Sequence, residues 1–394
     1  MVFIRRNVWL IALAALLRFA LATEASPACC EANGLPLLQQ FNDAQIVLFG
    51  HFENAKPAAN GVDFGTSEFV IERTFKDHDA LKGKTRITLS RYIPDSKTKY
   101  FLLCEIYKGR LDAYKGVALV NDREMIRYLD GAIKIKTRPP PERLRYAFDF
   151  LNSQEPEVAM DAYREFASAD YRDYQEIAKK LPAATIAGWL KDEKTPSFRH
   201  GLYAMLLGHC GGVQDAKLLL SMIDDPDKRR GSSLNGFLMA YTILEPEKGW
   251  SYIKDLVQSR DKPFLVRYAG LQTMRFLRDS RPDLVNPNDE SAARNEIVKG
   301  VASILDVPDM ADFAMEDLRK WQRWDYCAQV LDLWEKKGYE TAFARKAILR
   351  YALQCDTERA RKFVEAQRAR DPEWVDDIRE LLELETKAAP KSPK

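Results

Sequence analysis

The spacing of hydrophobic residues changes once along the chain, at a run of three prolines at residues 139–141. Before this run, short apolar segments alternate with polar residues and end at glycine, proline or asparagine, which is typical of β-strands. After it, apolar residues recur every three to four positions over longer segments, which predicts helices. The two patterns together predict an α+β multidomain fold. The proline run marks the boundary between them, because proline disfavours helix in the residue before it. A β-rich domain is expected at 29–135, a Pro-rich linker at 136–141 and an all-α region at 142–385.

The N-terminal region contains five segments with the composition and alternation of strands. They are residues 45–52, 67–75, 84–92, 98–107 and 114–120. A short helix is expected from Asp122, a good N-cap residue, to Leu129, with Gly131 as its stop signal. Several short strands at this spacing predict a small barrel or sandwich.

This order of strands resembles the OB barrel of the netrin and tissue-inhibitor-of-metalloproteinase type. The resemblance rests on three stretches that follow an N-terminal cysteine pair: Phe69-Val70-Ile71-Glu72-Arg73-Thr74-Phe75-Lys76, Leu81-Lys82-Gly83 and Ile87-Thr88-Leu89. It implies an OB-like barrel at 29–135 and a disulfide that tethers the N-terminal segment, from Cys30 or Cys29 to Cys104. The family begins with Cys-x-Cys and has several disulfides, whereas Cys29 and Cys30 are adjacent in this chain and only Cys104 lies nearby.

The same resemblance implies one alternative function, that of a metalloproteinase inhibitor. In that family, the amino group and the carbonyl of an N-terminal cysteine chelate the zinc ion of the enzyme. The role would require Cys29 at the first position of the mature chain. Cleavage of the chain after Ala28 would place it there, and cleavage after Ala22 would not.

The helical region contains an internal repeat. Five segments share a bulky or small starter residue, a small residue four positions later and an apolar stripe, and a sixth is degenerate. The five are 158–163, 197–202, 232–237, 265–270 and 343–348, and the sixth is 313–318. A single amphipathic helix pair cannot bury both of its faces, so repeated pairs stack into a continuous core. The layout resembles HEAT repeats over 139–385, which implies an α-solenoid but no particular ligand.

Two groups within the repeats are candidates for an interaction surface. Arg199, Arg267 and Arg345 occupy the same repeat position. They form either a basic ladder on the concave face or structural hydrogen bonds to a neighbouring repeat. Trp321 and Trp324 lie in an aromatic cluster that suits either a peptide or glycan platform or the packing of the core.

The N-terminus is expected to direct export. Arg5 and Arg6 precede an apolar run from Val8 to Leu17, and such a run is shorter than the roughly 20 residues that span a membrane. We predict a signal peptide at 1–28, with cleavage after Ala22 or Ala28. The mature protein should be soluble in the periplasm, in the cell envelope or outside the cell, with a disordered tail at 386–394.

Charge argues against a nucleic-acid partner. Cleavage after Ala22 removes three arginines and no acidic residue, so the formal net charge changes from +2 to −1. A near-neutral chain lacks the basic surface that nucleic acids require. The composition, 46% hydrophobic and 30% charged, is that of a globular protein with a sizeable core.

An exported chain permits disulfides, and one pair of the six cysteines is placed to form one. Segments 326–336 and 341–353 read as an antiparallel helical hairpin, in which the start of the first helix lies beside the end of the second. Cys327 and Cys355 occupy these two positions, so a disulfide between them is predicted. The alternative is two buried thiols.

No catalytic template is found in the chain. The G-x-S-x-G, H-E-x-x-H, G-x-x-x-x-G-K and G-x-G-x-x-G patterns are absent, and His200, His209 and Cys210 lack the spacing of a metal site. No cofactor is therefore expected. The sequence favours a non-catalytic scaffold that binds a protein or peptide, and a hydrolase with an unrecognised site is the second alternative.

Overall fold

The computed structural model describes residues 35–58, 64–94, 97–225 and 234–388. The expected signal peptide, the pair Cys29 and Cys30, and most of the C-terminal tail lie outside these residues. The chain divides into two compact units. Among described residues, the first comprises 35–181 with 192–195, and the second comprises 182–191 with 196–388.

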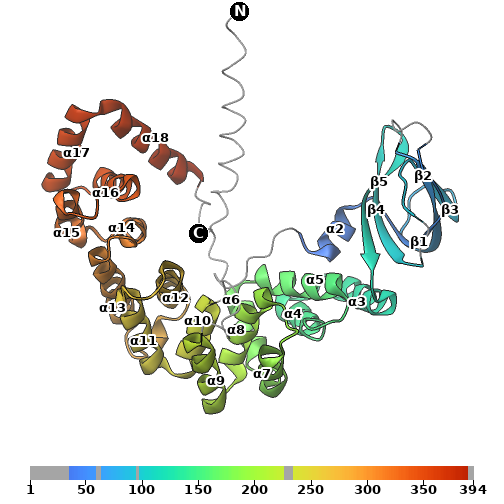
Figure 1. Ribbon diagram of the computed structural model, residues 1–394, viewed down its shortest axis with the longest axis horizontal. Helices are drawn as coiled ribbons and strands as arrows, with labels where there is room; N and C mark the ends of the chain where they lie inside the picture. The colour runs from blue at the N-terminus through green and yellow to red at the C-terminus, as the bar shows by residue number, and fades with distance from the viewer. Residues whose placement is uncertain (1–34, 59–63, 95–96, 226–233, 389–394) are drawn as a thin grey trace, which may run out of the picture. The chain divides into compact units, whose positions relative to one another are not determined.

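The first unit contains a five-stranded antiparallel sheet with the order β3-β2-β1-β4-β5 (Figure 1). Its strands are β1 (Ile46–Lys56), β2 (Thr66–Lys76), β3 (Arg86–Leu89), β4 (Lys99–Tyr107) and β5 (Arg110–Leu119). The five predicted strands are all present, although β3 is shorter than expected. Strands β3 and β5 form the two edges, so the sheet described by these pairings is open.

Both faces of the sheet are buried, which explains its mixture of alternating and continuous apolar runs. One face carries the cluster Ile46, Leu48, Phe52, Phe69, Leu81, Leu102, Cys104 and Ala113. On the other face, Phe101 packs against Phe41 of helix α2 (Leu37–Asp43), with ring centroids 5.1 Å apart. Gly50 of β1 is required at a bulge, since a Cβ there would lie 1.8 Å from the carbonyl oxygen of Val70.

Helix α3 (Asp122–Ile135) begins one residue earlier and ends later than predicted. Its N-cap is Asn121, whose side chain accepts a hydrogen bond from the Glu124 backbone at 3.1 Å. Gly131 does not stop the helix. It instead allows close contact with Tyr146, whose hydroxyl lies 2.0 Å from the position of an added Cβ and donates to the carbonyl of Tyr128.

The first helices after the proline run belong to the same unit as the sheet. They are α4 (Pro140–Phe148), α5 (Pro156–Ala167) and α6 (Tyr171–Ala178). Two buried carboxylates tie them to the N-terminal elements: Glu155 accepts from the Val120 backbone at 2.7 Å, and Asp161 accepts from the Tyr128 hydroxyl at 2.8 Å and from the Leu37 backbone. The compact units therefore divide after Leu181, not at the predicted linker.

Helices are the sole regular elements among the described residues of the second unit. Its α-helices are α7 (Ala183–Lys191), α8 (His200–Cys210), α9 (Val213–Asp224), α10 (Leu234–Leu244), α11 (Pro246–Gln258), α12 (Phe264–Ser280), α13 (Glu290–Ala302), α14 (Ala311–Lys320), α15 (Cys327–Asp332), α16 (Ala342–Gln354), α17 (Glu358–Arg370) and α18 (Pro372–Ala388). In the part of the chain that the structure describes, no helix is long and apolar enough to cross a membrane.

Contacts arrange these helices in two rows. Helices α8, α10, α12, α14 and α16, which we call the inner row, contact one another in that order. The intervening helices α9, α11, α13, α15 and α17 pack against them from one side. Figure 1 shows α12, α14 and α16 on the inner side of the curve that this unit follows, and α11, α13 and α15 on its outer side.

In two of the repeats, the shared small residue is a glycine at a close contact between helices. A Cβ at Gly236 of α10 would lie 2.7 Å from the carbonyl oxygen of Gly201 of α8, and both glycines occupy the small position of their repeats. Helices α8 and α10 therefore approach more closely than any side chain would allow. Helix starts are fixed locally, as where the Thr341 hydroxyl accepts from the Ala344 backbone at 3.2 Å.

Candidate interaction surface

Arg267 is a structural residue between two repeats. Its guanidinium is buried, donates from Nη1 to Asp309 Oδ1 at 2.9 Å and from Nη2 to Asp309 Oδ2, and donates from Nε to the Lys262 carbonyl at 3.0 Å. Asp309 precedes α14, so the contact links the α12 repeat to the next one. The hydrogen bonds from Arg267 lower the pKa of Asp309. At this position the structural interpretation of the arginines fits the geometry.

The other two arginines of the predicted ladder have different surroundings. Arg199 is buried before α8, and its guanidinium lies 5.4 Å from the ring centre of Phe198. Arg345 lies 3.9 Å over the ring of Trp334. The three arginines therefore share a repeat position but not a common exposed surface, since Arg199 and Arg267 are both buried.

Trp321 and Trp324 make intrachain contacts rather than a free platform. The guanidinium of Arg278 lies 4.3 Å over the ring of Trp321. Trp324 meets Tyr351 edge to face, with ring centroids 5.1 Å apart. Both tryptophans are half-buried between helices of the second unit, which is what the packing interpretation predicts.

Large apolar side chains lie instead at the first turns of three inner-row helices, and all of them except the half-buried Phe313 are exposed. We call Phe264 and Leu265 of α12, Phe313 of α14 and Phe343 of α16 the apolar row. Leu265 and Phe343 are 74% and 76% exposed. Phe264 lies 5.8 Å from Phe313, between ring centroids. The apolar row thus places one large apolar group or pair on each of three successive inner-row helices, at or beside the repeat starter.

Tyr268 fixes the base of this row. Its ring is stacked on Phe264 at 5.8 Å and tilted against Phe313 at 5.0 Å. Arg275, two turns further along α12, donates to the Tyr268 hydroxyl at 3.4 Å and to Asp317 of α14 at 2.8 Å. Burial raises the pKa of Asp317, and the charge of Arg275 opposes this rise. The aromatic contacts and this ion pair together hold α12 against α14.

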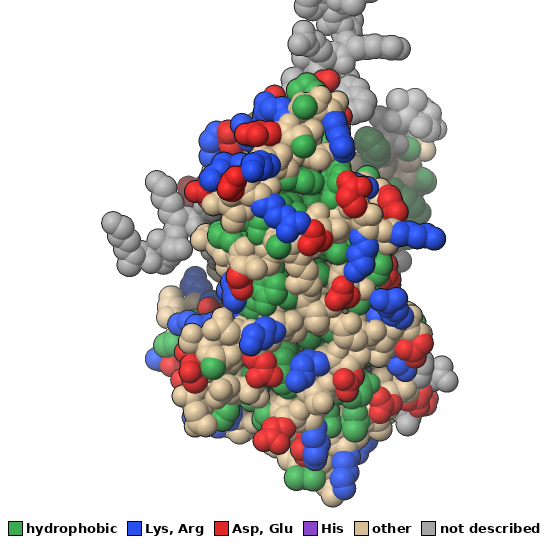
Figure 2. Space-filling view, turned by 90° about the vertical axis from the view of Figure 1, so that its left-hand side faces the viewer, with side chains coloured by type: hydrophobic (Ala, Val, Ile, Leu, Met, Phe, Trp, Pro, Cys, Tyr) green, Lys and Arg blue, Asp and Glu red, His purple; other side chains and the backbone are tan. Residues whose placement is uncertain are grey.

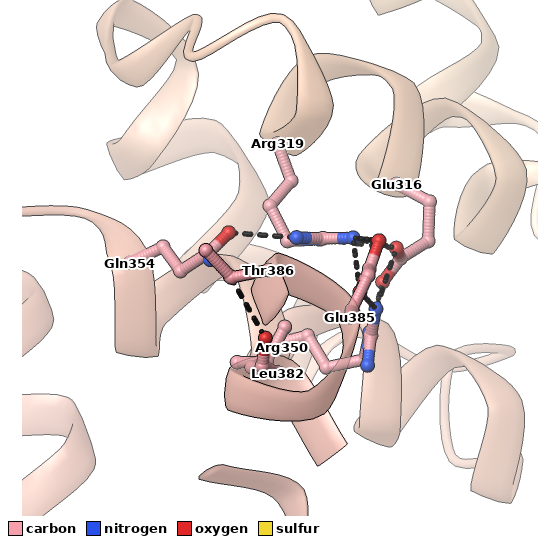
Figure 3. A network of polar contacts seen from close by, with 7 residues as sticks. All are labelled: Glu316, Arg319, Arg350, Gln354, Leu382, Glu385 and Thr386. Atoms are coloured by element: carbon pink, nitrogen blue, oxygen red, sulfur yellow. Dashed lines mark hydrogen bonds and ion pairs between the residues drawn. The ribbon is translucent and has the colours of Figure 1, made fainter. Parts of the chain in front are cut away.

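Two arginines of α14 and α16, the first buried and the second half-buried, bind two glutamates (Figure 3). Arg319 of α14 donates to Glu316 Oε2 at 2.8 Å and to Glu385 Oε1 of α18 at 2.9 Å. Arg350 of α16 donates to Glu316 Oε1 at 2.7 Å and also to Glu385. Gln354 accepts from Arg319 at 2.7 Å. The network is neutral and joins three helices.

One ion pair of this network could be predicted from local spacing, and the rest could not. Glu316 and Arg319 lie three residues apart on one helix, a spacing that favours an ion pair. Glu385 follows Arg319 by 66 residues, and no periodicity connects them. Although burial raises it, the hydrogen bonds and charges of Arg319 and Arg350 lower the pKa of Glu385 overall.

The described cysteines are all thiols: Cys104, Cys210, Cys327 and Cys355. Cys104 is fully buried in the core of the sheet, and burial raises its pKa to about 12. Its expected partner Cys30 lies outside the described residues, so that disulfide stays a prediction. Cys327 and Cys355 are buried thiols that both lie within hydrogen-bond distance of the Thr357 hydroxyl, and the disulfide between them stays a prediction.

Within the described residues, no three or more His, Cys, Asp and Glu side chains are grouped to hold a metal ion. His200 is buried in α8, whereas His209 and Cys210 lie at its end. No protein-family model, curated protein or solved structure matches the chain.

Proposed function

We propose that this chain is an exported, non-catalytic interaction protein whose helical unit is a HEAT-like solenoid that binds a protein or peptide along the apolar row. The sheet of the first unit is proposed to be an OB-like barrel that offers a second contact. The observation that carries the proposal is the exposure of Leu265 and Phe343, 74% and 76%, at the starts of α12 and α16, the inner-row helices on either side of α14. A partner that covers such a side chain gains about 2–3 kcal/mol for each.

The charge distribution favours a protein over a nucleic acid as this partner. On the side of the molecule drawn in Figure 2, Lys and Arg side chains are interspersed with Asp and Glu, and hydrophobic side chains lie between them. Nucleic acids select surfaces where basic residues gather. The two-row arrangement of helices supports the solenoid, because each helix contacts mainly the helices one or two positions away in the sequence.

Site-specific photocrosslinking tests the proposal. A photoreactive amino acid is placed at position 265 or 343 of the full chain, and the protein is irradiated in its native compartment. The matched control is position 299, an exposed lysine on α13, which is one of the intervening helices and not part of the inner row. A defined adduct at 265 and 343 that is missing at 299 is expected. Equal adduct yields at all three positions, or none, would overturn the proposal.

A further inference from the structure

Two thiols meet at the junction between α16 and α17. Cys327 is the first residue of α15, and Cys355 follows the last residue of α16. The Sγ atoms of Cys327 and Cys355 lie 3.1 Å and 3.5 Å from the same oxygen, Thr357 Oγ1. Both sulfurs thus lie beside one hydroxyl group, and the two thiols are also within hydrogen-bond reach of each other.

One of these thiols borders a cleft in the second unit. Cys355 lines a cleft of about 330 Å³, together with Arg361, Arg368 and Arg379. Asp356 and Glu365 also line it, so guanidinium groups outnumber carboxylates by three to two. Arg361 is paired with Asp356 and Arg368 with Asp376. Arg379 is exposed and contributes a third guanidinium to the lining.

We propose that this cleft is a thiol–disulfide exchange site that accepts a small anionic disulfide, such as glutathione disulfide, with Cys355 as the entry thiol and Cys327 as the resolving thiol. The cleft reaches Cys355, and its arginines complement the carboxylates of the reagent. Both thiols are buried, but only Cys355 lines the cleft, and this sets the order of the two steps. The inference is independent of the proposed protein-binding function.

Each step balances. The Cys355 thiol loses its proton, and its sulfur attacks one sulfur of glutathione disulfide. The S–S bond of the reagent breaks, a mixed disulfide forms at Cys355, and one glutathione leaves with the proton. Cys327 then loses its proton and attacks Cys355 Sγ. The mixed disulfide breaks, the Cys327–Cys355 bond forms, and a second glutathione leaves. The protein dithiol is oxidised by two electrons, and the glutathione disulfide is reduced.

Burial raises the pKa of Cys355, and the neighbouring Cys327 thiol adds to the rise, although Thr357 opposes it. The thiolate is the attacking species. The exchange should therefore be slow at neutral pH and become faster as the pH rises toward the raised pKa of the Cys355 thiol. This dependence would distinguish Cys355 from an unhindered surface cysteine.

Mass spectrometry of the full chain with glutathione disulfide tests the proposal. The wild type is expected to lose two hydrogen atoms, with peptide mapping that links Cys327 to Cys355. Cys327→Ser should instead gain one glutathione at Cys355. Acid quenching of the wild type at early times should trap glutathione on Cys355 and not on Cys327, a readout that needs no variant to fold. Modification at Cys327 first, or a mixed disulfide that never resolves, would overturn the assigned roles.

Arg379→Gln tests the recognition of the reagent. Its rate with glutathione disulfide should fall roughly threefold or more, because an attractive charge beside the cleft is removed. Its rate with hydroxyethyl disulfide, which is neutral, should be unchanged. Equal rates for variant and wild type with both reagents would overturn the charge recognition. No reaction of Cys355 with either reagent at alkaline pH would overturn the site itself.

Discussion

Asp161 is the residue at which burial and charge conflict most directly. It is fully buried in α5 and accepts hydrogen bonds from the Leu37 backbone and the Tyr128 hydroxyl. Burial raises its pKa from 3.8 to about 6, although these hydrogen bonds oppose the rise. The carboxylate thereby joins α2 and α3 to α5 at the expense of its own hydration.

The pH dependence of stability follows from that pKa. The folded protein binds the Asp161 proton more tightly than the unfolded chain, so stability should increase as pH falls from about 6 toward 3.8. The free energy of unfolding should differ by about 3 kcal/mol between the two ends of this pH range. Asp161→Asn should abolish this component, and Glu176→Gln, at an exposed position on α6, should not. Hydrogen exchange of β1 and α5 amides between pH 4 and 7 measures it. An unchanged pH profile in Asp161→Asn would contradict the assignment.

Arg267 and Asp309 should be strongly coupled. The guanidinium is 6% exposed, and Asp309→Ala would leave its charge with only the Lys262 carbonyl. A double-mutant cycle with Arg267→Ala should give a coupling energy of about 1–3 kcal/mol in urea unfolding. The exposed pair Lys336 and Asp306 is the control, with less than about 1 kcal/mol expected. Equal coupling in the two pairs would rule out a structural role for Arg267.

The interaction partners of these residues could not be predicted from the sequence. The repeat identified Arg199, Arg267 and Arg345 as equivalent, but equivalence of position did not determine their partners. The partner of Arg267 lies 42 residues away, and that of Asp161 lies 124 residues away. Such pairings depend on which helices meet in three dimensions, and hydrophobic periodicity carries no information about them.

The contact between α8 and α10 depends on the absence of a side chain. Gly236→Ala would place a methyl group 2.7 Å from the Gly201 carbonyl oxygen, so the helices must separate. Destabilisation of about 1–3 kcal/mol is expected in thermal or urea unfolding. Gly188→Ala, in α7 where nothing lies within 4 Å of an added Cβ, should instead be neutral or stabilising by up to about 1 kcal/mol. Equal effects of the two substitutions would disprove close packing at Gly236.

Helix α18 is held by Glu385 as well as by an apolar cluster of Leu349, Val375, Ile378 and Leu382. Glu385→Ala would remove one of the two carboxylates that pair with Arg319, whose side chain is only 4% exposed. Part of the buried positive charge would then lack a partner. The backbone amides of α18 should then exchange hydrogen with solvent faster, by a factor that corresponds to a loss of about 2–4 kcal/mol in the free energy of opening this helix. The exposed Glu383 on the same helix provides the matched control, Glu383→Ala. Unaltered exchange in Glu385→Ala would mean that the apolar cluster alone retains α18.

The pH sign at Glu385 is the opposite of that at Asp161. Its pKa is lowered in the folded protein, so its contribution is fully present above 4.5 and is lost as pH falls through the lowered value. Acid should therefore loosen α18 in the wild type and have less effect in Glu385→Ala.

At the level of elements, periodicity predicted the existence and type of most strands and helices. Five strands were expected and five are present, and the change to helices falls near the proline run as expected. The ends of helices differ from the prediction where tertiary contacts override local signals. Gly131 reads as a stop signal, yet α3 continues to Ile135 because the glycine accommodates Tyr146.

At the scale of the molecule, the units do not follow the change in secondary structure. Helices α4 to α6 belong with the sheet because Glu155 and Asp161 bind its flanking segments. A fragment that ends at residue 139 loses both carboxylates and should be unfolded by circular dichroism, whereas a fragment of residues 30–181 should fold cooperatively. A folded 30–139 fragment would show that the proline run is the true boundary.

The central claim, that the apolar row binds a protein partner, is tested most directly by co-purification from the native compartment. Leu265→Asp with Phe343→Asp is compared with Val213→Asp, which alters a 64% exposed apolar residue at the start of α9 in the other row. All three forms must show the same thermal unfolding. The account predicts that the double variant loses the proteins that co-purify with wild type by tenfold or more, roughly the effect of 1.4 kcal/mol, while Val213→Asp retains them. Retention of the same partners by the double variant would contradict it.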